Sequence, residues 1–443
     1  MPKSFSVLSK AVLLFTSLCM QPVFSAAQSE GAIVKDGPDA EIKEFRLVDL
    51  DASLRAMQAG PERDYFAGIL ANRTGHVTES IRLLNGALPS VRISRPDRAA
   101  VALQALADDY AKSFQYADAS QAYEDLLSHF SNHLNPEKLQ GAQDDAGVTQ
   151  ILRQAPPQTI TWDGATRLKT ERNPLNSLNV NLIVNGVQGP WLLDTGASLS
   201  VVSNSFAERL GLKLLPGVGQ TQAGLTGVEN PLRVALIATL QMGGATLHNV
   251  VVMVLDDANL KVGLGKQNYQ INGIIGYPVF QALGTVTFLR DGEFEAGDKT
   301  PQAGAGARMY MKLLTPVIEC TVEGKDLPFG LDTGASGTDL FARYYDLFRS
   351  ESKTWKKGKN KSFGAGGLVT RTIYIQPEVN LSIGNKKVTL KRVPIYTSGT
   401  GTDMDDLYGN LGQDVAAKFD SFTLDFARMT FSLGEPLSPE KTH

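Results

Sequence analysis

Apolar positions recur every three and four residues between about residues 38 and 148, and this spacing predicts α-helices with one buried face. Within residues 65–88, a break at Thr74 and Gly75 separates two helical stretches, and residues 106–130 repeat the same form. Glycine after a short polar residue is a common way to end a helix. We therefore predict a helical domain over residues 37–148 that is built from helix–turn–helix units.

The two units resemble a pair of tetratricopeptide repeats, and this resemblance covers about a quarter of the chain and rests on loose motifs. It implies a groove for a protein partner. The alternative is a helical cap packed on the rest of the protein, because two or three hairpins form a small array that is stabilised by leaning on a neighbour. Both interpretations stay open at this point.

Beyond the proline pair at residues 156 and 157, the pattern changes to short apolar, β-branched runs separated by Gly and Asn. The clearest runs are residues 180–184, 250–254 and 372–375. Frequent turns between short strands predict a mainly-β region. A stretch of linker composition at residues 297–306 divides it into a first half, residues 158–297, and a second half, residues 307–437.

The two halves repeat each other. Residues 194–198 and residues 332–336 both read Asp-Thr-Gly-Ala-Ser, and each copy follows an apolar run. At almost the same distance beyond these copies, residues 274–276 read Ile-Ile-Gly and residues 410–412 read Asn-Leu-Gly. A pair of motifs at matching separation indicates an internal duplication. A single Asp-Thr-Gly-Ala-Ser is typical of a polar turn, but two copies in matching contexts favour a facing carboxylate pair.

The duplicated motif resembles the pepsin and retropepsin superfamily, in which each lobe contributes an Asp-Thr-Gly loop and a later hydrophobic-hydrophobic-Gly segment. The resemblance covers about 280 residues, from 158 to 437, and is specific at the two Asp-Thr-Gly loops. It implies a mainly-β fold of two closed, barrel-like lobes. It also implies that Asp194 and Asp332 form a catalytic pair across one cleft.

The resemblance assigns supporting roles to residues around this pair. It implies that Thr195 and Thr333 hydrogen-bond across the interface between the lobes, and that Gly196 and Gly334 let the loops approach. It also implies that two further glycines pack behind the aspartates, although Asn410 departs from the apolar residue expected two positions before the second of them. These glycines are Gly276 and Gly412.

Hairpin flaps cover the cleft in such enzymes, and two glycine-rich segments are candidates. These are residues 221–227, which include Gly224 and Leu225, and residues 363–368, which include Gly366 and Gly367. The alternative is that each segment is an ordinary hairpin turn.

Two carboxyl groups within hydrogen-bonding distance cannot both ionise easily, so the pair shares one proton. The ionised group can then act as a general base on water, while the protonated group hydrogen-bonds the scissile carbonyl. Which aspartate is the base stays open, because the titration belongs to the pair. We therefore expect an aspartic endopeptidase that acts on a peptide or protein without metal or cofactor. The alternative is a non-catalytic peptide-binding or scaffold protein with the same fold.

The remaining composition favours no other class. The net charge of −3, from 43 basic and 46 acidic residues, gives no reason to expect nucleic acid as a partner. His248 is the only histidine between residues 158 and 437, so a Ser-His or Cys-His enzyme would depend on it alone. No zinc motif or phosphate-binding glycine loop is present in the sequence. We interpret the basic run at residues 353–361 as a solvated loop, and the alternative is a contact surface.

Residues 1–26 have the pattern of a secretory signal peptide: two lysines, the apolar run 11–15, and small residues around 25–27. The apolar run is shorter than the roughly 20 residues that span a bilayer, so we expect no stable membrane span after cleavage. Cys19 follows Leu18 rather than the small residue that a lipoprotein site requires. We expect an exported protein, periplasmic or secreted, in which Cys320 is the only cysteine left and no intrachain disulfide forms.

Overall fold

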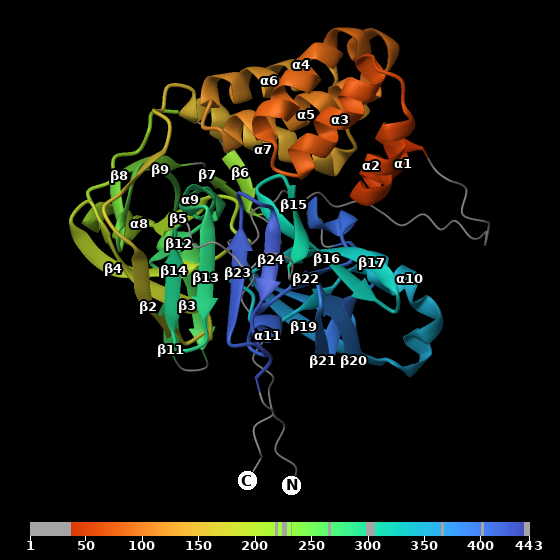
Figure 1. Ribbon diagram of the computed structural model, residues 1–443. Helices are drawn as coiled ribbons and strands as arrows, with labels where there is room; N and C mark the ends of the chain where they lie inside the picture. The colour runs from red at the N-terminus through yellow and green to blue at the C-terminus, as the bar shows by residue number, and fades with distance from the viewer. Residues whose placement is uncertain are drawn as a thin grey trace.

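The structure is a computed structural model that describes residues 37–217, 220–223, 228–231, 233–264, 267–297, 306–364, 367–399 and 403–437. A helical region over residues 38–152 is followed by a mainly-β region (Figure 1). Most of its strands form a closed barrel, and two strand pairs form separate small sheets. The predicted fold class, helical and then mainly β, is therefore confirmed. The predicted signal peptide and most of the predicted linker, residues 298–305, lie outside the described residues.

Seven α-helices make up the described part of the helical region. They are α1 (Pro38–Lys43), α2 (Leu47–Ala56), α3 (Pro61–Arg73), α4 (Val77–Ser94), α5 (Pro96–Lys112), α6 (Tyr116–His129) and α7 (Pro136–Leu152). The two predicted units are the hairpins α3–α4 and α5–α6, and the turn of the first contains Gly75 at φ 76°. The last helix runs four residues past the predicted limit of 148. It ends shortly before Pro156, because the residue before a proline is disfavoured in a helix.

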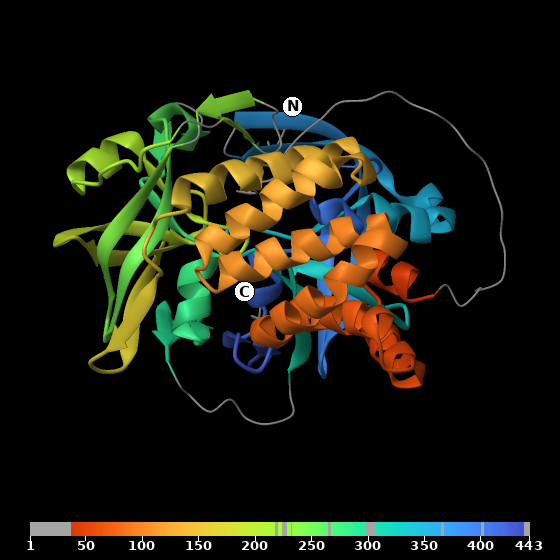
Figure 2. The same ribbon diagram turned by 90° about the horizontal axis from the view of Figure 1, so that it is seen from above.

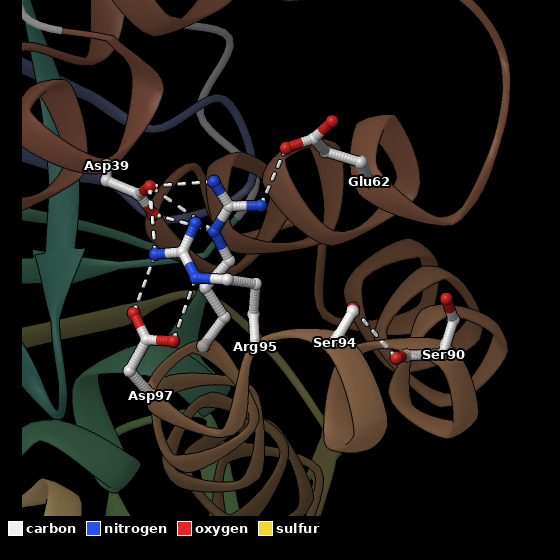
Figure 3. Close-up of polar contacts among 7 residues, drawn as sticks. Asp39, Glu62, Ser90, Ser94, Arg95 and Asp97 are labelled. Carbon is white, nitrogen blue, oxygen red and sulfur yellow. Dashed lines mark hydrogen bonds and ion pairs between the residues drawn. The ribbon is translucent and has the colours of Figure 1, made fainter.

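A network of charged side chains ties α1 to the start of α5 (Figure 3). Arg98 donates to Asp39 and to Glu62, at 2.7 Å each, and Arg95 donates to Asp97 at 2.7 Å. Exposed ion pairs contribute about 0–1 kcal/mol each, so the network orients the short α1 helix more than it stabilises the fold.

Each half of the β region contributes its own set of strands. The first half contains β1 (Thr159–Trp162), β2 (Thr166–Arg172), β3 (Leu178–Val184), β4 (Val187–Leu193), β5 (Ser200–Ser203), β6 (Gln220–Ala223), β7 (Val228–Pro231), β8 (Val234–Met242), β9 (Ala245–Leu255), β10 (Lys261–Leu264), β11 (Gln267–Gln270), β12 (Gly273–Ile275), β13 (Thr285–Leu289) and β14 (Glu293–Ala296), with helices α8 (Asn204–Arg209) and α9 (Tyr277–Leu283). The second half contains β15 (Ala307–Lys312), β16 (Thr315–Val322), β17 (Lys325–Leu331), β18 (Asp339–Leu340), β19 (Lys356–Gly364), β20 (Gly367–Ile383), β21 (Lys386–Tyr396), β22 (Gly409–Leu411), β23 (Ser421–Asp425) and β24 (Thr430–Leu433), with helices α10 (Ala342–Leu347) and α11 (Gln413–Ala416).

The two halves repeat one strand arrangement around the two aspartate loops. The strand before each aspartate pairs in parallel with a later strand that is followed directly by a glycine: β4 with β12, and β17 with β22. That later strand also pairs antiparallel with the strand after the aspartate loop, β5 in the first half and β18 in the second. The duplication in the sequence is therefore a duplication of the fold.

A sheet shared by both halves joins them. Its strands run in the order β2-β14-β13-β23-β24-β15, and the junction is the antiparallel pair β13–β23 (Figure 1). At the centre of this junction, the hydroxyls of Thr287 and Thr423 are 2.9 Å apart. Beside them, the rings of Phe288 and Phe422 stack with centroids 4.5 Å apart. The halves are therefore held in one relative position by main-chain pairing and by aromatic burial.

The helical region packs on both halves (Figure 2). Phe45 meets Tyr310 of the second half with ring centroids 6.1 Å apart. Tyr116 and Leu152 share a buried apolar cluster with Met253 of the first half. Helix α7 also contacts strand β6. The helices therefore form a cap that rests on both halves, and partner binding by this region stays a prediction.

The interpretation of residues 353–361 as a loop was wrong. The run begins in the last two residues of a 3₁₀ turn, Arg349–Thr354, and continues as β19. In this strand Lys356, Lys357 and Lys359 are exposed. Within the described chain β19 pairs only with β20, so it is an edge strand. Lysines are common on edge strands because they discourage pairing with other chains, and this explains a basic run within a strand.

A buried polar cluster lies in the helical region. Asn72 donates to Asp108 and to Asp109, at 2.8 Å each, and Lys112 donates to Asp108 at 2.5 Å. Burial raises the pKa of Asp109 to about 7, and the nearby charge of Lys112 opposes this rise. In the folded protein the carboxyl of Asp109 is therefore mostly neutral below about pH 7.

We predict that Asp109→Asn removes a pH-dependent loss of stability. The folded pKa of Asp109 exceeds the unfolded value of about 3.9, so the folded state loses stability as the pH rises from about 4 to about 7. Asn has the same shape but cannot ionise. The Tm of the full-length variant should match the parent at pH 4 and exceed it increasingly up to pH 7. Asp118→Asn, at an exposed position of α6, is the control, and a constant Tm difference for Asp109→Asn would contradict the prediction.

Candidate active site

The two aspartates of the duplicated motif stand at the ends of buried strands. Apolar residues of β4 and β17, Leu193 and Leu331, bring Asp194 and Asp332 to the interface between the halves. The Asp194 amide donates to the Ile275 carbonyl at 3.1 Å, and the Asp332 amide donates to the equivalent Leu411 carbonyl at 3.0 Å. Each aspartate is therefore fixed at its main chain by the strand that returns beside it.

Thr195 and Thr333 link the two loops by reciprocal hydrogen bonds. The Thr195 amide donates to the Thr333 hydroxyl at 3.0 Å, and the Thr333 amide donates to the Thr195 hydroxyl at 3.1 Å. Each hydroxyl then donates to a carbonyl of the other half: Thr195 to Leu331 at 3.1 Å, and Thr333 to Leu193 at 2.9 Å. All four bonds are buried, so each half satisfies polar groups of the other.

Glycine is required where each loop meets the opposite aspartate. A Cβ atom at Gly196 would lie 2.7 Å from Cγ of Asp332, and one at Gly334 would lie 2.5 Å from Oδ2 of Asp194. Such separations are too short for any side chain. The structure therefore brings Asp194, Asp332 and the two glycines together in one buried place.

Burial sets the electrostatics of this site. Asp194 is 0% exposed and Asp332 is 1% exposed. Burial raises the pKa of Asp194 well above its usual range; the charge of Asp332 and a hydrogen bond between the two carboxyl groups raise it further. Burial also raises the pKa of Asp332, but hydrogen bonds from Asp194, Ala335 and Asn410 oppose this rise. Two carboxyl groups buried side by side in this way favour the state in which they hold one proton between them.

The two later glycines pack against the loops behind the aspartates. A Cβ at Gly276 would lie 2.5 Å from the Leu199 main chain, and one at Gly412 would lie 2.4 Å from the Gly337 main chain. Their amides donate to the side chains of Ser200, at 3.1 Å, and of Thr338, at 3.2 Å.

Four residues that contact the aspartate loops or the glycines behind them were not predicted from the sequence. Ser200 and Thr338 stand six residues after each aspartate, so comparing equal offsets in the two halves could have found them. Gln413 donates to the Thr333 carbonyl at 2.6 Å, and Asn410 donates to Oδ2 of Asp332 at 3.0 Å. Asn410 was noticed only as a departure from an apolar pattern.

The described parts of the two predicted flap segments belong to two antiparallel strand pairs. Strand β6 pairs with β7, and β19 pairs with β20, in which Gly367 lies opposite Gly364. Gly224, Leu225 and Gly366 lie outside the described residues. A flap role for either hairpin stays a prediction.

Three further findings concern metal binding, membrane-spanning helices and the thiol of the described chain. No group of three or more His, Cys, Asp or Glu side chains in the described ranges is placed to hold a metal ion. Among the same residues, no helix has the length and apolar character needed to cross a membrane. Cys320 is buried, and burial raises the pKa of its thiol.

Comparison with known proteins finds that part of the chain is similar to one family. Residues 180–279 match the family model for aspartyl proteases. A retropepsin-like aspartic protease from Rickettsia conorii is 20% identical; the match covers 31% of this chain and 92% of that chain, with a TM-score of 0.22. Basic 7S globulin from soybean is 11% identical over 63% of this chain and 95% of that chain, with a TM-score of 0.38. No curated protein matches the chain.

We predict that Thr195→Val destabilises the protein by roughly 2–6 kcal/mol. Valine removes the hydroxyl, so the buried Thr333 amide and Leu331 carbonyl each lose a partner, at about 1–3 kcal/mol per group. Urea unfolding of the full chain measures the change. Thr195→Ser keeps the hydroxyl and is the matched control. Equal stability of the two variants would show that the reciprocal bonds do not hold the loops together.

Proposed function

We propose that this protein is an aspartic endopeptidase that hydrolyses peptide bonds with a water molecule activated jointly by Asp194 and Asp332. The observation that most supports the proposal is the contact between two buried carboxyl groups that come from equivalent loops of the two halves. The aspartyl protease match over residues 180–279 supports it independently for the first half.

The proposed chemistry follows from sharing one proton between two acids. The ionised carboxylate accepts a proton from water as the water attacks the scissile carbonyl carbon. The protonated carboxyl donates a hydrogen bond to the carbonyl oxygen, where negative charge develops. Thr195, Thr333 and the glycines of the loops keep the two acids in register, so the binding of substrate need not assemble the site.

The substrate class that we propose is a peptide or protein, bound across the junction of the two halves. Export after cleavage of residues 1–26 is part of the proposal, and it is supported by the signal-peptide pattern of that segment. A second arrangement is that the helical cap recruits one protein and the β region trims that protein alone.

We predict that Asp194→Asn and Asp332→Asn each lower kcat/KM for peptide cleavage by roughly a hundredfold to ten-thousandfold, the usual contribution of general acid–base catalysis. Circular dichroism should show an unchanged fold, because Asn replaces a buried carboxyl with a group of the same shape. Asp326→Asn is the control: Asp326 is exposed and accepts from Thr321 through Oδ1, which Asn retains. Full activity in either dyad variant would end the proposal.

Incubation of the parent with a mixed peptide library at acidic and neutral pH separates an enzyme from a scaffold. We expect cleaved products whose formation is blocked by a statine-type inhibitor, because such inhibitors place a hydroxyl between the two carboxyl groups. Saturable peptide binding without cleavage at any pH would favour the non-catalytic alternative.

A further inference from the structure

The two halves differ in one pair of residues beside the aspartates. In the first half, Leu192 of β4 lies opposite Ile274 of β12, and both are buried apolar residues. In the second half, the equivalent positions are Gly330 of β17 and Asn410 of β22. An apolar pair in one half is therefore replaced by a glycine and an amide in the other.

Gly330 provides the space that the Asn410 side chain occupies. A Cβ atom at Gly330 would lie 2.6 Å from Oδ1 of Asn410. Asn410 is 3% exposed, and its Nδ2 donates to Oδ2 of Asp332 at 3.0 Å. A buried amide is costly unless it makes hydrogen bonds. The Nδ2 of Asn410 makes one to Asp332, whereas its buried Oδ1 has no partner within the described residues.

The two carboxyl groups receive unequal numbers of hydrogen bonds. Asp332 accepts from the Ala335 amide through Oδ1 at 2.9 Å and from Asn410 through Oδ2. Asp194 accepts from the Gly196 amide through Oδ1 at 2.9 Å, and within the described residues no side-chain amide donates to it as Asn410 does to Asp332. Donors to a carboxylate favour its ionised form, so the environment of Asp332 suits the negative charge better.

We propose that Asn410 is a positioning residue that holds the negative charge of the pair on Asp332 and leaves the shared proton on Asp194. The pKa of Asp194 is raised well above its usual range by burial, whereas the hydrogen bond from Asn410 is among the contacts that oppose the rise at Asp332. The titratable group that faces Asp332 is Asp194, and Asp339 of β18 lies opposite Asn410. The placement of charge is a property of the free protein, while its catalytic consequence rests on the proposed function.

The inference assigns a separate role to each acid. Asp332 accepts a proton from the water as the water oxygen bonds to the carbonyl carbon, and Asp194 gives its proton to the carbonyl oxygen, which yields a neutral gem-diol. Asp332 then gives its proton to the amide nitrogen as the C–N bond breaks. One hydroxyl of the gem-diol returns a proton to Asp194 as the carbonyl of the new acid forms. The pair ends in its starting protonation state.

Titration of each carboxyl alone tests the charge placement without any need for activity. Asp194→Asn leaves Asp332 as the titrating group, and Asp332→Asn leaves Asp194. The ¹³Cγ signal of labelled aspartate identifies each group by comparison with the double variant. We expect Asp332 to titrate at the lower pH. Adding Asn410→Leu, which has a similar shape but no donor, should raise the pKa of Asp332 by about 1–2 units, since a hydrogen bond to a charged group contributes about 1.5–3 kcal/mol.

The same substitution should leave the pKa of Asp194 unchanged in the Asp332→Asn background. An equal shift in the pKa of both carboxyl groups would assign Asn410 a merely structural role and overturn the proposal. An unchanged pKa of Asp332 would overturn it as well. Asn410→Ala removes the donor without adding bulk and gives the same readout if Asn410→Leu does not fold.

The pH dependence of kcat/KM tests the catalytic consequence. The acid limb, which reports ionisation of the pair, should move to higher pH by about 1–2 units in Asn410→Leu and Asn410→Ala. Ile274→Val, at the equivalent position of the first half, changes packing but no donor and should keep the limb of the parent. A lower rate with an unmoved limb would overturn the inference. A parent without any cleavage would remove the proposed function instead, and the titration would still decide the charge placement.

Discussion

The reciprocal hydrogen bonds between Thr195 and Thr333 are the contact on which the remaining site depends. Each hydroxyl accepts from the amide of the other threonine and donates to a carbonyl of the other half, so neither loop satisfies its buried polar groups alone. An unpaired buried amide or carbonyl costs about 1–3 kcal/mol, so separating the halves would leave several such groups unpaired. This constraint places Gly196 and Gly334 against the opposite carboxyl groups, and the glycines in turn set how close the two acids come.

Two larger interfaces also hold the halves together, so their association does not depend on the threonine bonds alone. The β13–β23 junction pairs the halves through the main chain, and the stacked Phe288 and Phe422 bury apolar area beside it. The helical cap adds contacts to both halves, through Phe45 on one and Tyr116 on the other. Because hydrophobic burial is proportional to area and not directional, these interfaces supply stability, while the threonine bonds supply the geometry.

The local pattern of the sequence predicts the helical hairpins, the mainly-β region and the duplication, because each depends on periodicity or on repetition along the chain. It also identifies Asp194 and Asp332 as candidate site residues, since an identical pentapeptide in matching contexts is visible without coordinates. Contacts between residues far apart in sequence were not predictable in this way. Gln413 reaches the Thr333 carbonyl across 80 residues, and no local window of the sequence contains both. The lysine run was misinterpreted for another reason: its charge is typical of a solvated loop, but it pairs across one hairpin with β20.

A duplicated fold supplies two equal carboxyl groups, yet the chemistry of water activation needs one base and one acid. Coupling between the two acids ensures that a single proton is shared, but in a symmetric site either acid would hold it equally well. Some difference between the halves must therefore favour the shared proton on one of the two acids. The bonds donated by the two aspartate amides do not provide it, because Asp194 and Asp332 make equivalent contacts with Ile275 and Leu411. The exchange of an apolar pair for Gly330 and Asn410 does, since it adds one donor to one acid and leaves the strand pairing intact. The asparagine that departs from the expected apolar pattern in the sequence is, in three dimensions, a source of the asymmetry that the proposed reaction requires.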